Sequence, residues 1–300
     1  MNLDYIKRVL GLEGKKAIVT GGNSGIGKSA AISLANMGAD VTIIGRDQQS
    51  LDETVAELKM INPECAGYSV DIKNKNEVDA FFDRYYDDNG GKLDILIANA
   101  GVCYYIRALE TTEEDVDYFF DINYKGTLFC CQQAAKAMKK QYSGNIIIVT
   151  SVNALYPLPT EAAYSSTKGA LEVLMQCLAV DLGPYNIKVN TLAPGGVYTN
   201  IDRGRFGYIN KNDIVHHHHG HGHQHDHNDH DQHDHQVDHD RHDDHVSDQG
   251  PRRPNRGLAL GRMGEPEDMG DAIACLVSDA FRYMTGSTVL IDGGLKLRNV

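Results

Sequence analysis

Short apolar runs recur along the chain, and polar residues do not alternate within them. Runs of this kind are typical of strands that are covered on both faces of a sheet. They predict seven strands, which fall within residues 17–20, 41–44, 68–70, 93–98, 145–150, 187–192 and 288–291.

Apolar residues at helical spacing fill the stretches between the first of these runs. One helical pattern stops at Gly38, a second stops before Pro63, and a third covers residues 78–85. Strands that alternate with helices in this way are joined by right-handed crossovers. We therefore expect an α/β fold, with a doubly wound parallel sheet of about seven strands and helices on both faces.

One segment, residues 201–257, shows neither period. All 14 histidines of the chain lie in its part 216–245, together with eight aspartates and one arginine. Low-complexity polar sequence of this composition does not form a packed core. We interpret residues 201–257 as a disordered insertion in a connection, and residues 1–300 as a single domain.

The composition is that of a globular protein. Apolar residues make up 41% and charged residues 23% of the 300-residue chain, which suffices for one large core. No run of 18 apolar residues and no signal-peptide-like block is present, so neither a membrane span nor secretion is expected. The six cysteines show no CxxC spacing, which favours reduced thiols in a cytoplasmic protein.

The charge is acidic and unevenly distributed. The net charge of −12 argues against a nucleic acid or an anionic membrane as partner. Residues 216–245 carry −7 of it, which leaves −5 for the rest of the chain, an ordinary value for a cytoplasmic protein.

The first expected strand runs directly into a glycine-rich turn, residues 20–27, with the sequence TGGNSGIG. A turn this tight needs residues without a Cβ, and the helix that follows supplies free N–H groups and a positive dipole. Both features suit a pyrophosphate, which we expect at the carboxyl ends of the strands. A tight turn without any ligand would use the same glycines, so further motifs have to decide.

Those motifs follow in a fixed order. They are Asn99-Ala100-Gly101 after the fourth strand, Asn123, Ser151 at the end of the fifth strand, Tyr164 and Lys168 in a YxxxK pattern, Pro194-Gly195 with Thr199, and Asp292-Gly293-Gly294. With the TGxxxGxG turn, they make residues 13–200 and 257–295 resemble the short-chain dehydrogenase/reductase family, in its compact single-domain branch. The resemblance implies a Rossmann-type fold and an NAD(P)-dependent oxidoreductase that interconverts a secondary alcohol and a ketone.

The YxxxK pattern has its own chemical logic. Tyr164 and Lys168 lie four residues apart, which places both on one face of the expected helix 162–182. A free tyrosine has a pKa of about 10, and a nearby ammonium lowers that pKa because it favours the phenolate. The resemblance implies that Tyr164 is the general acid in reduction and the base in oxidation, and that Lys168 binds the nicotinamide ribose.

Two further catalytic roles come from the resemblance alone. Ser151 would donate a hydrogen bond to the substrate oxygen and stabilise the charge that develops there. Asn123 would hold a water that connects Lys168 to solvent. Hydride transfer itself belongs to the cofactor, and no metal is required for it.

The end of the second strand bears on the choice of cofactor. Gly45 stands where NAD-preferring relatives carry an aspartate, and Arg46 suits a 2′-phosphate, so NADP(H) is favoured over NAD(H). Arg46 could also be a surface arginine, and Asp71 could be a helix cap rather than a ligand of the adenine. The resemblance implies that the cofactor is bound by Thr20, Gly21, Asn23, Ser24, Gly25, Ile26, Gly27, Arg46, Asp71, Ile72, Asn99, Ala100, Gly101, Tyr164, Lys168, Pro194, Gly195, Val197 and Thr199.

Substrate and assembly are less well defined by the sequence. The motifs near the C-terminal end resemble those of 3-oxoacyl-carrier-protein reductases and of sugar and polyol dehydrogenases alike, and they imply a small-molecule substrate and a homotetramer. Candidate pocket-wall residues are Tyr104, Tyr105, Tyr156 and Tyr198. A serine hydrolase with a histidine base is excluded, because no histidine lies outside residues 216–245 and no G-x-S-x-G motif is present.

The histidine tract suits Zn, Ni, Cu and Co ions. Three interpretations stay open: incidental chelation by a solvated segment, metal storage or sensing, and a pH response as the imidazoles titrate around pH 6.5. A metal-buffering or metal-sensing protein on a reductase scaffold is therefore the alternative function. Its candidate ligands are His216, His217, His218, His219, His221, His223, His225 and His227.

Overall fold

The structure, a computed structural model, describes residues 2–199, 201 and 258–299. The strands are β1 (Lys16–Thr20), β2 (Asp40–Gly45), β3 (Ala66–Ser69), β4 (Ile95–Ala98), β5 (Gly144–Val149), β6 (Ile187–Pro194) and β7 (Thr288–Ile291). The helices are α1 (Leu3–Leu10), α2 (Gly25–Asn36), α3 (Gln48–Ile61), α4 (Lys75–Asp88), α5 (Glu113–Phe119), α6 (Thr127–Gln141), α7 (Ala162–Leu182) and α8 (Pro266–Val277). A π-helical turn, η2 (Phe120–Gly126), joins α5 to α6.

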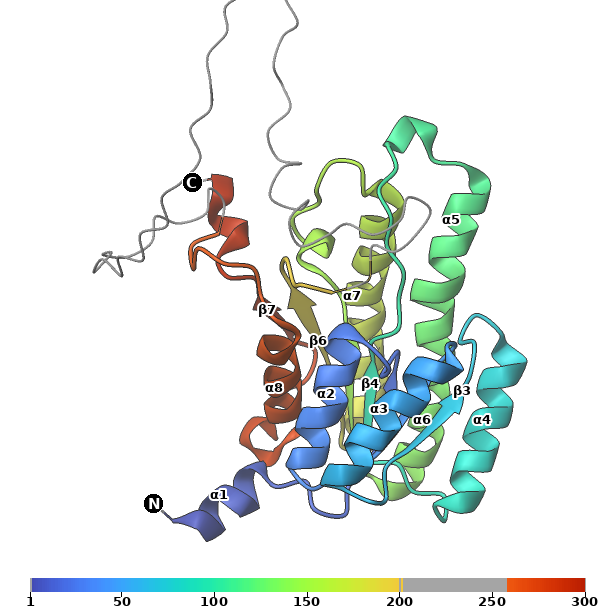
Figure 1. Ribbon diagram of the computed structural model, residues 1–300, viewed down its shortest axis with the longest axis vertical. Helices are drawn as coiled ribbons and strands as arrows, with labels where there is room; N and C mark the ends of the chain where they lie inside the picture. Colours follow the sequence, from blue (N-terminus) through green and yellow to red (C-terminus); the bar gives the residue numbers. More distant parts are fainter. Residues whose placement is uncertain (1, 200, 202–257, 300) are drawn as a thin grey trace, which may run out of the picture.

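All seven strands lie in one parallel sheet, in the order β3-β2-β1-β4-β5-β6-β7 (Figure 1). The predicted doubly wound α/β fold is therefore confirmed. The chain fills the sheet outward from β1 to β3 and then returns to start again at β4. Parallel sheets of this type bind ligands at the carboxyl ends of the strands where this reversal occurs, which is between β1 and β4.

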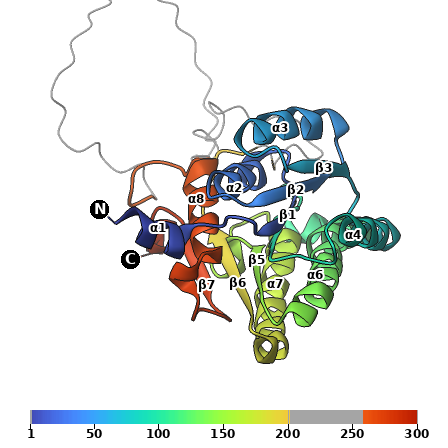
Figure 2. The same cartoon turned by 90° about the horizontal axis from the view of Figure 1, so that it is seen from below.

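Two helical layers cover the sheet (Figure 2). Leu34 of α2 and Ile273 of α8 are fully buried on one face, together with residues of α3. Phe82 of α4 and Met175 of α7 are fully buried on the other, together with residues of α6. The central strands β1, β4 and β5 are mostly apolar and buried because both of their faces are covered in this way, whereas the edge strands β3 and β7 are only partly buried.

Helix ends follow the predicted signals where those signals are strong. α2 ends just before Gly38, whose φ of +97° stops the helix, and α3 ends at Ile61, before Pro63. The helical patterns in the sequence predicted none of α1, α5, α6 and α8, nor the π-helical turn η2. α8 carries a readable start signal, since Glu265 and Asp268 form a reciprocal cap around Pro266.

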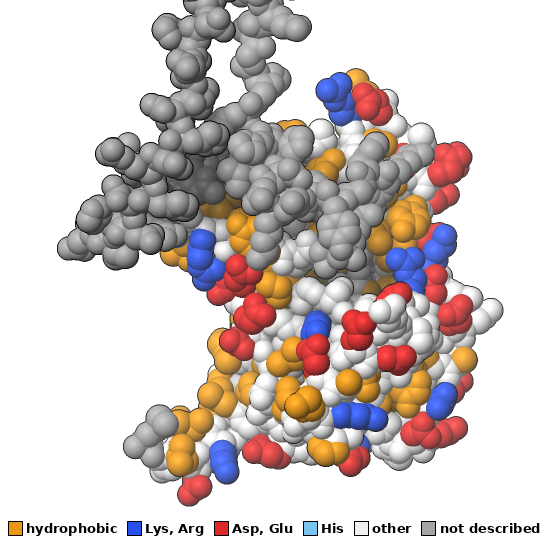
Figure 3. All heavy atoms as spheres, viewed as in Figure 1, with side chains coloured by type: hydrophobic (Ala, Val, Ile, Leu, Met, Phe, Trp, Pro, Cys, Tyr) orange, Lys and Arg blue, Asp and Glu red, His pale blue; other side chains and the backbone are white. Residues whose placement is uncertain are grey.

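The described surface is ordinary in its charge. Acidic and basic side chains are interspersed over the described part of the face shown in Figure 3. None of the described helices is both long and apolar enough to cross a membrane. Apart from residue 201, the predicted insertion 201–257 lies outside the described residues, so it stays a prediction.

Candidate active site

The glycine-rich turn between β1 and α2 takes a shape that side chains would prevent. Gly21 and Gly25 have φ angles of +64° and +51°, in the left-handed region that favours glycine. A Cβ on Gly27 would lie 2.2 Å from the carbonyl oxygen of Gly21. Ser24 precedes α2 without capping it, so the first turn of the helix keeps its N–H groups for a ligand. The turn is a cradle that fits a pyrophosphate.

Thr20 and Asn99 tie the end of β1 to the end of β4. The Thr20 hydroxyl oxygen accepts hydrogen bonds from the backbone N–H groups of Asn99 (3.0 Å) and Ala100 (2.9 Å). The Asn99 side-chain amide donates to the carbonyl oxygens of Thr20 (3.0 Å) and Gly21 (3.3 Å). These four bonds fix the position where the strand order reverses.

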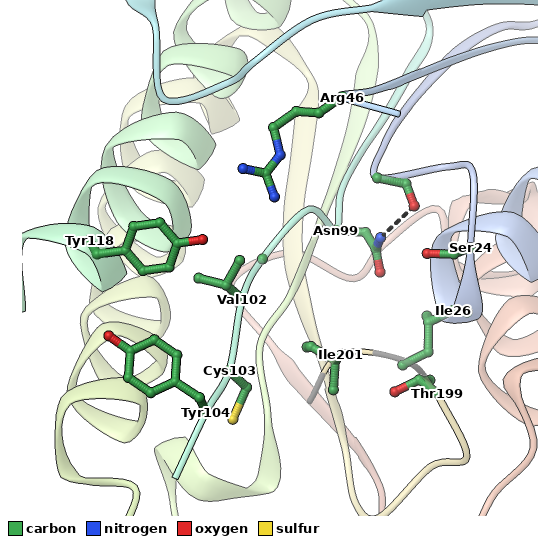
Figure 4. A pocket seen from close by; sticks show the side chains of 13 residues that line it. Ser24, Ile26, Arg46, Asn99, Val102, Cys103, Tyr104, Tyr118, Thr199 and Ile201 are labelled. Carbon is green, nitrogen blue, oxygen red and sulfur yellow. Dashed lines mark hydrogen bonds between the residues drawn. The ribbon is translucent and has the colours of Figure 1, made fainter. Parts of the chain in front are cut away.

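A cavity of about 310 Å³ opens at this place. In Figure 4, Ser24, just before α2, and Ile26 of α2 lie on one side of it, while Tyr104 and Tyr118 lie across from them. Of the predicted cofactor residues, those that line the cavity are Gly21, Ser24, Gly25, Ile26, Arg46, Asn99, Gly101 and Thr199. Its remaining lining residues are Val102, Cys103, Tyr104, Tyr118 and Ile201.

Arg46, directly after β2, is the charged side chain among the described residues that line the cavity. A Cβ on Gly45 would lie 2.5 Å from the side-chain oxygen of Asn23, so the Asn23 amide fills the space beside Gly45. The Asn23 amide also donates to the Ser50 hydroxyl (2.8 Å). The neighbouring Asp47 carboxylate caps α3, where it accepts from the Ser50 N–H (2.8 Å). The Ser50 side chain, and after it this backbone N–H, lower the pKa of Asp47.

Asp71 and Ile72 lie away from this cavity. The Asp71 carboxylate accepts from the backbone N–H of Lys73 (3.0 Å), within the turn that leads into α4. Ile72 is buried against η2, since a Cβ on Gly126 would lie 2.7 Å from its side chain. Neither residue is among the described residues that line the cavity. The alternative that Asp71 caps a helix is wrong, because Asn74 is the N-cap residue of α4 and Asp71 closes the turn before it.

Tyr164 and Lys168 occupy one face of α7, as their spacing predicts. Both are buried, with 8% and 3% of their surface exposed, and the Lys168 ammonium lies 5.7 Å from the centre of the Tyr164 ring. The ammonium donates a hydrogen bond to the Val149 carbonyl at the end of β5 (3.0 Å). Burial lowers the pKa of Lys168 to about 8, and Cys103 and Glu172 act in the opposite direction.

Asn123 lies in the π-helical turn η2 and is fully buried. Its side-chain oxygen accepts from the Val102 N–H (2.8 Å), and its amide donates to the Val102 carbonyl (3.0 Å) and to the Thr167 hydroxyl (3.1 Å). The Asn123 side chain therefore clamps the loop after β4 onto α7. Turns of π-helix are frequent at functional sites, and this one fixes the position of Val102, the residue that follows Gly101.

Ser151 begins the segment after β5 and is buried. Its hydroxyl oxygen accepts from the backbone N–H of Asn153 (3.1 Å), which starts a short 3₁₀ turn. The Asn153 amide in turn donates to the buried Glu161 carboxylate, three residues before Tyr164. Both ends of the segment that links Ser151 to Tyr164 are therefore anchored.

The segment after β6 returns towards the glycine-rich turn. The Gly195 N–H donates to the Ile291 carbonyl (2.9 Å), and a Cβ on Gly195 would lie 2.6 Å from the Cα of Asp292. Pro194 closes β6, and Val197 pairs with Gly264. Thr199 lies against Gly25, with its methyl group 3.2 Å from where a Cβ on Gly25 would stand.

The sequence analysis did not assign all of the lining residues. Val102 and Cys103 directly follow the Asn99-Ala100-Gly101 motif, so their position was a usable signal. Tyr104 was one of four candidate tyrosines, and it is the one of the four that lines the cavity among the described residues. Its hydroxyl donates to the buried Asp115 carboxylate (2.7 Å). Tyr118 had no motif to identify it.

The predicted metal ligands belong to the histidine tract and not to the segments that line the cavity. The candidate ligands between His216 and His227 fall outside the described residues. Within the described ranges, no group of three or more histidine, cysteine or acidic side chains is arranged to hold a metal ion.

Comparison with known proteins identifies the class. A family profile described as short chain dehydrogenase matches residues 15–207, and one described as Enoyl-(Acyl carrier protein) reductase matches residues 245–296. The chain belongs to the short-chain dehydrogenase/reductase family. It is an NAD(P)-dependent oxidoreductase, as the motifs led us to expect.

Individual relatives cover nearly the whole chain. The L-rhamnose 1-dehydrogenase (NAD(P)(+)) of Sphingomonas sp. (strain SKA58) is 31% identical over 95% of this chain and 97% of that protein. The L-xylulose reductase of Mus musculus is 30% identical over 95% of this chain and 98% of that protein. Among solved structures, gox2181 superposes with a TM-score of 0.78 and 26% identity, over 98% and 99% of the two chains.

Proposed function

We propose that this enzyme interconverts a secondary alcohol and a ketone on a sugar or polyol, that NADP(H) is its preferred cofactor, and that Tyr164 transfers the proton. The observation that carries this proposal is the short separation between Gly101, which lines the cavity, and the buried Lys168 ammonium. Ser151, Tyr164 and Lys168 themselves are not among the described residues that line the cavity. A Cβ on Gly101, which lines the cavity, would lie 3.2 Å from the Asn123 side-chain oxygen and 3.5 Å from the Lys168 ammonium. A ligand in the cavity therefore comes within reach of the acid–base group.

Different segments of the chain would bind different parts of the cofactor. The cradle of Gly21, Gly25 and Gly27 would hold the pyrophosphate of the cofactor, and the segment from Pro194 to Thr199 would hold its nicotinamide end. When bound, the cofactor supplies or accepts the hydride.

Tyr164 and Lys168, both on α7, carry out the proton transfer. In reduction, Tyr164 donates its phenolic proton to the carbonyl oxygen, and the Ser151 hydroxyl donates a hydrogen bond to the same oxygen. The Lys168 ammonium, close to the Tyr164 ring, stabilises the phenolate that remains. Because the Asn123 side chain is occupied by Val102 and Thr167, a water that relays protons would bind its main-chain carbonyl.

The preference for NADP(H) is supported by the end of β2. Arg46 lines the cavity and projects its guanidinium towards it (Figure 4). The one carboxylate next to it, Asp47, is committed to capping α3. A guanidinium without a competing carboxylate attracts a 2′-phosphate, whereas a ribose hydroxyl is better served by an acid.

The substrate class is supported by the relatives and by the cavity wall. Both reported relatives act on sugars by name. Tyr118 points its hydroxyl group towards the cavity (Figure 4), whereas Tyr104 adds an aromatic ring to the wall and donates its hydroxyl to Asp115. Hydroxyl groups on a pocket wall suit a polyhydroxylated ligand, which needs several hydrogen-bond partners.

We also infer a homotetramer, which the outer face of α7 supports. Val173 and Val180 are 60% and 76% exposed, and Cys177 between them is exposed as well. An apolar stripe of this kind on a helix is typical of a contact between subunits. Light scattering should give four times the chain mass, and Val180→Glu should give a smaller species; a monomeric wild type would contradict the inference.

The decisive experiment measures turnover by the purified protein with matched cofactors. NADPH and NADH oxidation would be followed with L-xylulose and with a 3-oxoacyl thioester, and NADP+ and NAD+ reduction with L-rhamnose and xylitol. We expect turnover with at least one sugar or polyol, preferentially with the phosphorylated cofactor, and loss of it in Tyr164→Phe. Turnover of the thioester alone would contradict the substrate class, and equal activity of Tyr164→Phe would contradict the mechanism.

A further inference from the structure

Glu172 is a buried carboxylate that the proposed chemistry does not use. It lies on α7, one helical turn beyond Lys168 and two turns beyond Tyr164, on the same face of the helix. Only 7% of its surface is exposed. A carboxylate that is removed from water needs compensating partners, so each of its contacts carries information.

Its partners are three threonine hydroxyls from three neighbouring strands: one directly after β5, one within β6 and one at the start of β7. One carboxylate oxygen accepts from Thr150, directly after β5, at 2.6 Å. The other accepts from Thr191 of β6 (2.9 Å) and from Thr288 of β7 (2.5 Å). Glu172 therefore joins the helix of Tyr164 and Lys168 to three adjacent strands at once.

Two of the joined elements carry other parts of the proposed site. Thr150 immediately precedes Ser151, and the strand of Thr191 ends at Pro194, where the segment for the nicotinamide end begins. Lys168 makes a parallel contact one turn away, since its ammonium donates to the carbonyl of Val149. Two successive residues, Val149 and Thr150, are thus held by two successive turns of α7.

We propose that Glu172 is a positioning residue of the active site, whose carboxylate sets the place of Ser151 and of the nicotinamide segment relative to Tyr164 and Lys168. The inference rests on the proposed function, because it assumes that these residues carry out the reaction. Functional side chains that must be aligned within a fraction of an ångström depend on such supporting hydrogen bonds.

An uncharged or apolar residue would not replace this carboxylate. Three hydroxyl groups converge on it, and each needs an acceptor. Thr150 has a second acceptor in the Leu192 carbonyl (3.3 Å) and Thr191 has one in the Thr288 hydroxyl (3.1 Å), each at a longer distance than the carboxylate. A glutamine offers one oxygen to hydroxyls that approach two, so at least one contact would have to reorganise.

The charge of Glu172 also reaches the proton-transfer pair. The titratable groups that face the Lys168 ammonium in the described chain are Tyr164 and Glu172 from α7 itself and Cys103 from the loop after β4. Next to it, η2 contributes the uncharged Asn123, and β5 contributes a carbonyl. A negative charge favours the protonated form of every neighbour, so removing it lowers the pKa of Lys168 and of Tyr164 alike.

The test compares Glu172→Gln with Asp94→Asn. Asp94 is a matched control, because it is an equally buried carboxylate of the same sheet, at the amino ends of the strands. The titration of Tyr164 would be followed as the near-ultraviolet tyrosinate absorbance of each protein minus that of the same protein with Tyr164→Phe. This readout requires no substrate. Thr150→Val, which removes one hydroxyl without changing the shape, serves as the second variant if Glu172→Gln does not fold.

We expect Glu172→Gln to shift the Tyr164 titration to lower pH by about half a unit and to lower kcat about tenfold, with little change in KM for the cofactor. Thr150→Val should lower kcat in the same way without the shift, and Asp94→Asn should leave titration and kcat unchanged. An unshifted titration with unchanged kcat in Glu172→Gln, or an equal loss of kcat in Asp94→Asn, would overturn the proposal. Full activity of Tyr164→Phe would instead overturn the proposed function, so the two failures are distinguishable.

Discussion

Asp94 at the amino edge of the sheet and Glu172 at the carboxyl edge are equally buried carboxylates, and their surroundings differ. At the amino edge, Asp94 accepts from the backbone N–H of Lys16 (2.9 Å) and pairs with the ammonium groups of Lys15 (3.5 Å) and Lys92 (3.4 Å). Those lysines are about half exposed. At the carboxyl edge, Glu172 is surrounded by neutral hydroxyls, and the nearby ammonium of Lys168 is itself buried.

This difference indicates that Asp94 contributes to stability and that Glu172 contributes to function. An ion pair with half-exposed lysines neutralises a carboxylate at little cost in stability, and it does not hold neighbouring side chains in one fixed geometry. A buried carboxylate held by three hydroxyls, next to a buried ammonium, is costly for stability and geometrically specific. The cavity and the strained glycines of the TGGNSGIG turn also lie at the carboxyl edge. Substitutions at the two edges should therefore have opposite consequences for activity and for stability.

The largest expected effect on cofactor binding is that of Gly27→Ala. The new Cβ would stand 2.2 Å from the Gly21 carbonyl, so the pyrophosphate cradle must open. We expect the Kd for NADPH, measured by fluorescence titration, to rise at least about 100-fold. The matched control is Gly91→Ala at the amino edge, where φ is +75° but no atom lies within 4 Å. It should lower the melting temperature and leave the Kd unchanged; equal Kd values for Gly27→Ala and wild type would contradict the role of the turn.

Lys168→Met should inactivate the enzyme and stabilise the fold. The pKa of Lys168 is about 8 in the folded protein against an ordinary 10.5, so the unfolded chain binds more protons between these pH values. Burial of the ammonium therefore destabilises the fold fully below pH 8, and the penalty fades as the pH rises towards 10.5. At pH 7 the variant should gain up to about 3 kcal/mol in denaturant unfolding.

That gain should narrow above pH 8 and be absent in Lys59→Met, which replaces an exposed lysine. A variant less stable than the wild type at pH 7 would show that the hydrogen bond to Val149 outweighs the burial of the charge.

Arg46→Gln should act on one cofactor only. Loss of the guanidinium removes the partner of a 2′-phosphate, so KM for NADPH should rise about tenfold while KM for NADH stays within a factor of two. Arg84→Gln, at an exposed arginine of α4 that pairs with Asp88, is the control. An equal rise in both KM values would mean that Arg46 supports the loop and does not select the cofactor.

Asp94→Asn should have the smallest effect on activity of the four. The amide keeps an acceptor for the Lys16 N–H but loses the two ion pairs, so the free energy of unfolding should fall by about 1 kcal/mol. We expect kcat to remain within a factor of two. A tenfold loss of kcat would remove the distinction between the two edges.

The sequence predicted the elements at the carboxyl ends of the strands better than the helices at the periphery of the fold. The strands, the turn at residues 20–27 and the spacing of Tyr164 and Lys168 are local patterns, and each was recognised. α1 and α8 were missed although both are amphipathic and α8 is as long as α2, because neither stands between two of the predicted strands in the alternating first half of the chain. Tyr118 and Glu172 were missed because their roles depend on contacts across the sheet, which no local pattern contains. The position of Asp71 in a turn was likewise open until its partners were known.

The central claim is that Tyr164 transfers the proton at a site continuous with the cofactor cavity. Its most direct test is the rate of NADPH oxidation with L-xylulose by the wild type and by Tyr164→Phe, alongside NADPH binding to both. We predict that the variant loses at least about 1,000-fold in kcat while its Kd for NADPH stays within a factor of three of the wild type. A variant that keeps its turnover would contradict the claim.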